Sequence, residues 1–128
     1  MDRKKLKPIK TLSGNGEIRK AGKHFANCTY HLQVAQEIII SESLSDKQEI
    51  PGGYIVSGTV TISQQELLKP GILPGIVSGE IFTLHLSDGS RLETNFNPIR
   101  NPNNPINGIY SIHPAPGAKI PGMEIRIL

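Results

Sequence analysis

Alternation of apolar and polar residues over positions 28–40 is the feature that most constrains the fold of this chain. The apolar side chains recur at even positions, and they are Cys28, Tyr30, Leu32, Val34, Ile38 and Ile40. Polar residues hold most of the odd positions between them. A period of two over more than ten residues predicts a long β-strand with one buried face. Gln36 interrupts that face and indicates a bulge, a bend or the end of the covered stretch.

A second alternating stretch predicts a strand from Tyr54 to Ile62. The four residues after it, 63–66, have the form of a capping box, because Ser63 can accept from an early helix amide and Glu66 can reach back. Pro70 and Gly71 would end such a helix. The sequence therefore predicts one short connecting helix over about residues 64–69.

Two further alternating runs flank residues 87–89 and predict a β-hairpin. A two-residue loop would place buried positions opposite exposed ones, whereas a three-residue loop with Gly89 in the left-handed conformation keeps the two faces separate. The resulting register pairs Leu84 with Leu92, Phe82 with Thr94, His85 with Arg91 and Thr83 with Glu93.

Shorter strands are expected at 17–20, 109–112 and 123–128, with a polar loop at 41–50 and an irregular Asn- and Pro-rich loop at 97–108. Gly and Pro fill 23 of the 128 positions, which is typical of short strands joined by tight turns. The expected fold is all-β: a small antiparallel barrel or sandwich of about seven or eight strands, forming a single domain over residues 14–128.

Positive charge is concentrated at the start of the chain. Eight of the fourteen Lys and Arg residues lie in the first 23 positions, and residues 1–25 carry a net charge of +6. The remaining six cations and nine carboxylates give residues 26–128 a net charge of −3. Residues 1–13 show no periodicity and contain Pro8, so we expect a mobile basic arm followed by an ordered basic group at 19–23.

This charge pattern favours a non-catalytic binding or accessory module that contacts nucleic acid or an acidic partner surface. Lys and Arg neutralise phosphates and release counterions without sequence preference, with a limiting slope of log affinity against log salt of roughly −7 for eight contacts. The candidate residues are Arg3, Lys4, Lys5, Lys7, Lys10, Arg19, Lys20 and Lys23. The opposing interpretation is a tail that keeps the protein soluble and protects a sheet edge.

A second hypothesis is a small-molecule or metal-binding barrel, with enzymatic activity left open. Its site would use four residues predicted on the polar face: His31, His85, Arg91 and Glu93. No two of the four histidines have the spacing of a local zinc pair, and no catalytic motif is present, so we expect no cofactor and no metal. A third hypothesis is a structural subunit of a larger assembly that is contacted through the 97–108 loop.

Other reactive side chains have simpler interpretations. Cys28 and His31 lie three positions apart on the predicted strand and therefore face opposite sides, so Cys28 is expected to be a buried structural residue. Carboxylates at 37, 42, 46 and 49 lack the rhythm of a calcium loop and are expected to be solvated. The single cysteine and the charged N-terminus favour a cytoplasmic protein with no membrane contact. They do not indicate an oligomeric state.

Overall fold

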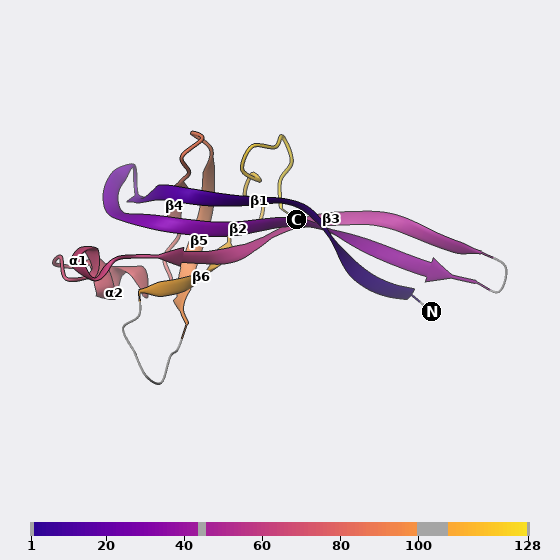
Figure 1. Cartoon of the computed structure of the whole chain (residues 1–128), viewed down its shortest axis with the longest axis horizontal. Helices are drawn as coiled ribbons and strands as arrows, with labels where there is room; N and C mark the ends of the chain where they lie inside the picture. The colour runs from indigo at the N-terminus through magenta and orange to yellow at the C-terminus, as the bar shows by residue number, and fades with distance from the viewer. Residues whose placement is uncertain (1, 44–45, 100–107, 128) are drawn as a thin grey trace.

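The computed structural model describes residues 2–43, 46–99 and 108–127. Within them it has six strands and two short helices (Figure 1). In chain order these are β1 Asp2–Lys20, β2 Lys23–Glu42, β3 Lys47–Thr61, α1 Gln64–Leu67, α2 Ile72–Ile76, β4 Phe82–His85, β5 Arg91–Pro98 and β6 Ile109–Pro114. The all-β prediction is confirmed.

All six strands are antiparallel and belong to one sheet in the order β1-β2-β3-β6-β5-β4. Because β1 also pairs with β4 over residues 17–19, the sheet closes on itself. The strand count is six instead of seven or eight, because residues 123–127 contribute only an isolated bridge between Lys119 and Arg126. The expected strand at 17–20 is the end of the long β1.

The β4–β5 hairpin has the predicted register. Gly89 has φ +89°, as the three-residue loop requires, and the four predicted residue pairs are all formed. The hydroxyl of Ser63 accepts from the Glu66 amide at 3.2 Å and caps α1. The second helix, α2, is not predicted by the sequence, because Pro74-Gly75 there resembles a turn before a strand. It buries Ile72 and Ile76, which are one helical turn apart.

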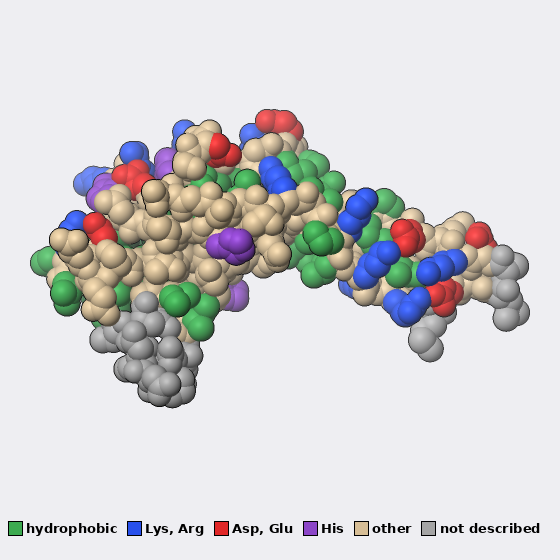
Figure 2. Space-filling view, viewed as in Figure 1, with side chains coloured by type: hydrophobic (Ala, Val, Ile, Leu, Met, Phe, Trp, Pro, Cys, Tyr) green, Lys and Arg blue, Asp and Glu red, His purple; other side chains and the backbone are tan. Residues whose placement is uncertain are grey.

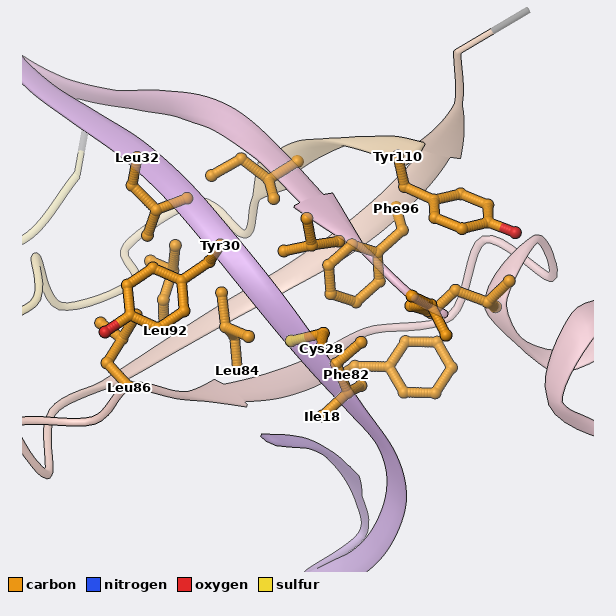
Figure 3. Packing of buried hydrophobic residues seen from close by; sticks show 14 of the residues in the cluster. Ile18, Cys28, Tyr30, Leu32, Phe82, Leu84, Leu86, Leu92, Phe96 and Tyr110 are labelled. Carbon is orange, nitrogen blue, oxygen red and sulfur yellow. The ribbon is translucent and has the colours of Figure 1, made fainter. Parts of the chain in front are cut away.

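The core fills the space enclosed by the closed sheet and is mainly aliphatic, with a few aromatic rings (Figure 3). Phe82 packs against two other rings, with centroid distances of 4.8 Å to Phe25 and 5.8 Å to Phe96. The Tyr30 hydroxyl lies 2.9 Å from Ser87 Oγ and accepts from the Ser87 amide at 3.1 Å. The polar end of this buried ring is thereby satisfied where β2 meets the β4–β5 turn.

Gly58 allows β2 and β3 to approach closely inside the barrel. It has φ +143°, and a Cβ placed there would lie 2.2 Å from the carbonyl oxygen of His31. Any side chain at this position would therefore push the two strands apart.

Beyond the barrel, β1, β2 and β3 continue outward as a three-stranded layer, which we call the projecting sheet (residues 2–9, 35–42 and 47–55; right in Figure 1). Register shifts mark its base, one between Pro8 and Lys10 on β1 and one between Gln36 and Ile38 on β2. Such bulges bend a strand and change its twist. The break in alternation at Gln36 therefore coincides with a bulge or similar irregularity, and a bulge is one of the three alternatives expected at this position.

Residues 2–13 belong to the long strand β1, whereas the sequence predicts a mobile arm there. They are hydrogen-bonded to β2 in register from Asp2 opposite Ser41 to Ser13 opposite His31. The expected loop at 41–50 is likewise largely strand, with only its tip between β2 and β3. The physical reason is that β2 is long enough to serve as a template for a strand on each side.

Candidate binding surfaces

One face of the projecting sheet has an apolar centre covered by charged side chains. Ile38 and Ile40 of β2 are buried, yet they lie outside the barrel's core cluster. Arg3 pairs directly with Ile40 and Lys5 with Ile38, so all four side chains share this face. The apolar stems of the two cations can lie along the isoleucines while their charged ends stay in water.

Two ion pairs cross this face. Arg3 binds the carboxylate of Glu42, and Lys5 Nζ lies 2.8 Å from Glu49 Oε1. Since Glu49 belongs to β3, the Lys5 pair spans the middle strand. The hydrogen bond from Lys5 lowers the pKa of Glu49. These pairs are exposed and contribute little stability individually, but they orient the side chains that cover the two isoleucines.

The opposite face is more apolar and less covered. Lys4 lies opposite Ile39, which in turn lies opposite Ile50, so the three form one row across the sheet. Ile50 is 46% exposed, and Leu6 on the same face is 59% exposed. Within the described residues, no strand pairs with the outer edge of β1 over 2–16 or of β3 over 47–58. This face therefore combines the cation of Lys4 with exposed apolar side chains, and it lies between the edges of β1 and β3 that are unpaired in the described chain.

The projecting sheet brings the basic N-terminal segment against the acidic stretch of the chain. Residues 2–10 contain five cations and one carboxylate, and residues 35–55 contain four carboxylates and one lysine. The net charge of these segments is only +1. Figure 2 shows the mixture, with Lys and Arg side chains interspersed with Asp and Glu along this part of the molecule.

The ordered basic group at 19–23 is also largely paired. Arg19 and the His24 ring both bind the carboxylate of Glu17, with His24 Nδ1 2.6 Å from Glu17 Oε2, and Lys20 binds Glu80. The hydrogen bonds from Arg19 and then His24 lower the pKa of Glu17. Of the eight predicted cations, four have no carboxylate of a described side chain within 4 Å: Lys4, Lys7, Lys10 and Lys23.

The structure places three of the four residues of the alternative polar-face site side by side, because Arg91 pairs with His85 and Glu93 follows two positions along β5, but His31 lies apart from them. His85 lies between Glu17 of β1 and Arg91 of β5, in one row across the outside of the barrel. His31 lies opposite Ser13, two side-chain rows away along β1 and β2. Burial, followed by the charges of Arg19 and Arg91, lowers the pKa of His85.

Arg91 and Glu93 also line a cavity of about 390 Å³ between the β4–β5 hairpin and the C-terminal segment. The other wall carries two cations that the sequence does not single out, Lys119 and Arg126. Lys10 reaches its rim, where Lys10 Nζ donates to the carbonyl oxygen of Pro121 at 2.8 Å. The sequence predicts a strand at 123–128 but gives it no partner, so only the structure shows that Lys119 and Arg126 face this cavity.

Cys28 is buried, and desolvation raises the pKa of its thiol to about 12, which disfavours a nucleophilic role. No group of three or more metal-ligating side chains occurs in the part of the chain that the structure describes. None of its helices there is both long and apolar enough to cross a membrane. Most of the 97–108 loop, the expected contact of a structural subunit, lies outside the described residues.

Comparison with protein-family models, with curated proteins and with solved structures finds no match.

Proposed function

We propose that this protein is a non-catalytic binding module that contacts an acidic protein surface through its projecting sheet. One observation carries the proposal: the sheet extends beyond the barrel and presents Lys4 in one row with Ile39 and Ile50. A surface that combines a cation with apolar side chains suits a protein partner, since the apolar groups gain from burial and the cation selects an acidic counterpart.

The charge balance favours a protein over nucleic acid. Most of the cations first considered as phosphate ligands already have carboxylate or carbonyl partners, and only Lys4 and Lys7 on the projecting sheet have no described carboxylate within 4 Å. Two phosphate contacts give a slope of log affinity against log salt of about −2 on duplex DNA, compared with a slope of roughly −7 for eight contacts. Stacking platforms for single strands also need exposed aromatic side chains, and this sheet has none on the Lys4 face.

The test uses fluorescence anisotropy with labelled poly-glutamate and a labelled 20-nucleotide single strand as probes of the two partner classes. The full chain should bind poly-glutamate with salt-dependent affinity. Lys4→Glu should weaken that binding about tenfold, because it replaces an attraction with a repulsion at the contact.

Lys23→Glu is the matched control. Lys23 is also exposed and without a described carboxylate partner, and it lies at the β1–β2 turn, at the other end of these strands. It should leave the affinity nearly unchanged. Equal weakening by the two variants would contradict a contact through the projecting sheet, and tighter binding of the oligonucleotide than of poly-glutamate would replace the protein partner with nucleic acid.

A further inference from the structure

The cavity beside the β4–β5 hairpin has the composition of an anion site. One wall is the outer surface of the hairpin, including Ser90, Arg91 and Glu93, and the other is the segment 118–126. Figure 1 shows the C-terminal loop, in yellow, rising beside the β4–β5 turn. The volume of about 390 Å³ falls in the range of small-molecule sites.

Three cations line this space. Lys119 and Arg126 form an isolated antiparallel bridge, so they lie directly opposite each other and their side chains share one side of the segment. Arg91 approaches from the hairpin and has no carboxylate of a described residue within 4 Å.

The existing partners of these cations leave most of their donors available. Arg126 Nη1 donates to the carbonyl oxygen of Gly117 at 3.0 Å, which occupies one of its five N–H groups. Lys119 Nζ lies 3.1 Å from Glu124, whose side chain is 93% exposed and is therefore easily exchanged for a ligand. Glu93 is the one carboxylate among the lining residues, so the lining carries a net charge of +2.

We propose that this cavity binds a small phosphorylated ligand, with Arg91 and Arg126 as the main phosphate donors. A net charge of +2 matches a phosphate dianion better than a single carboxylate. Arginine presents planar pairs of N–H donors that fit phosphate oxygens in a bidentate manner. No aromatic side chain lines the cavity, so recognition of a nucleobase by stacking is not part of the proposal. The site uses none of the residues of the proposed partner contact.

Isothermal titration of the full chain with inorganic pyrophosphate tests the proposal. Saturable binding with one site is expected, and Arg91→Gln and Arg126→Gln should each weaken it about tenfold, as the loss of a charge-assisted hydrogen bond implies. Arg3→Gln removes an arginine from the distant projecting sheet and should leave the affinity unchanged, as should Lys4→Glu. Success here is therefore independent of the outcome with poly-glutamate.

Amide chemical shifts provide a location that does not depend on any variant. Pyrophosphate should shift the amide resonances of Ser90 and Gly122, which lie on the two walls. Absence of saturable binding at millimolar pyrophosphate, shifts confined to other residues, equal weakening by Arg3→Gln, or tighter binding of citrate would each overturn the assignment.

Discussion

Ile38→Ala should loosen the projecting sheet and leave the barrel intact. Ile38 is buried in the sheet between β1 and β3, but it does not belong to the barrel's core cluster. Truncation removes three carbons from a covered position, and at about 0.8 kcal/mol per buried methylene the loss is about 2 kcal/mol. This cost falls on the local opening of the three outer strands.

Native-state amide hydrogen exchange is the direct assay, because it measures the free energy of each opening separately. A loss of about 2 kcal/mol should speed exchange about 30-fold at residues 3–7 and 36–41. Amides of the barrel strands should keep their rates, and the melting temperature should move by no more than a few degrees.

Two control variants define the result. Ile50→Ala truncates a side chain that is 46% exposed on the other face, so it should accelerate exchange less than Ile38→Ala. Leu32→Ala removes a fully buried side chain of the barrel core and should lower the global free energy of unfolding by about 2–5 kcal/mol. The reasoning is refuted if Ile38→Ala lowers the melting temperature as much as Leu32→Ala, or if the outer amides exchange at unchanged rates.

Three further outcomes are expected. Gly58→Ala should lower the free energy of unfolding in chemical denaturation by about 3–5 kcal/mol, because the new Cβ meets a steric clash at a strained φ. Gly117→Ala has open space around its Cβ at φ +78° and should lower it by only about 1–2 kcal/mol. Similar losses for the two variants would contradict the close approach of β2 and β3 at Gly58. Cys28, with a thiol pKa of about 12, should react with a thiol reagent at pH 8 on the order of 10³-fold more slowly than in urea, and comparable rates would show that it is accessible. Because the pKa of His85 is lowered in the folded protein, the unfolded chain binds a proton at this histidine at higher pH than the folded chain does. The contribution of neutral His85 to stability is therefore present above pH 6.5 and is lost as the pH falls through the lowered pKa. Arg91→Gln should raise the pKa of His85 in an NMR titration, and an unchanged pKa would remove Arg91 as a cause.

Much of the barrel could be predicted because its strands each have one buried face. The alternation along β2 and the paired faces of β4 and β5 follow from that condition, and so does the hairpin register. The capping residue of α1 was also identifiable, since Ser63 supplies the side-chain oxygen that an early helix amide needs.

The outer half of β1 could not be predicted because it lies in a single layer of sheet. Strands in such a layer need no apolar face of their own, and Arg3 and Lys5 cover the isoleucines of β2 with their stems. A basic strand of this kind has the composition of a disordered tail. Its pairing depends on residues 27 to 39 positions away in the chain.

The residues of the candidate cavity site also differ in how far the sequence predicts them. Arg91 and Glu93 were recognisable because they occupy outward positions of a predicted hairpin, and both line the cavity. Lys119 and Arg126 meet through one isolated bridge. The expected strand at 123–128 contains Arg126, but its alternation does not identify Lys119 as the residue opposite, so their proximity comes from tertiary contacts.

Continuity of β2 has a mechanical consequence. This strand runs without a loop from the barrel to the outer end of the projecting sheet, roughly 25 Å beyond it for eight residues at the usual rise. A pull directed along the sheet therefore loads the β1–β2 and β2–β3 ladders in shear, so that many hydrogen bonds resist together. Tension applied at the outer end of the projecting sheet is therefore transmitted directly to the strands of the barrel, and the projecting sheet behaves as a rigid extension and not as a flexible linker.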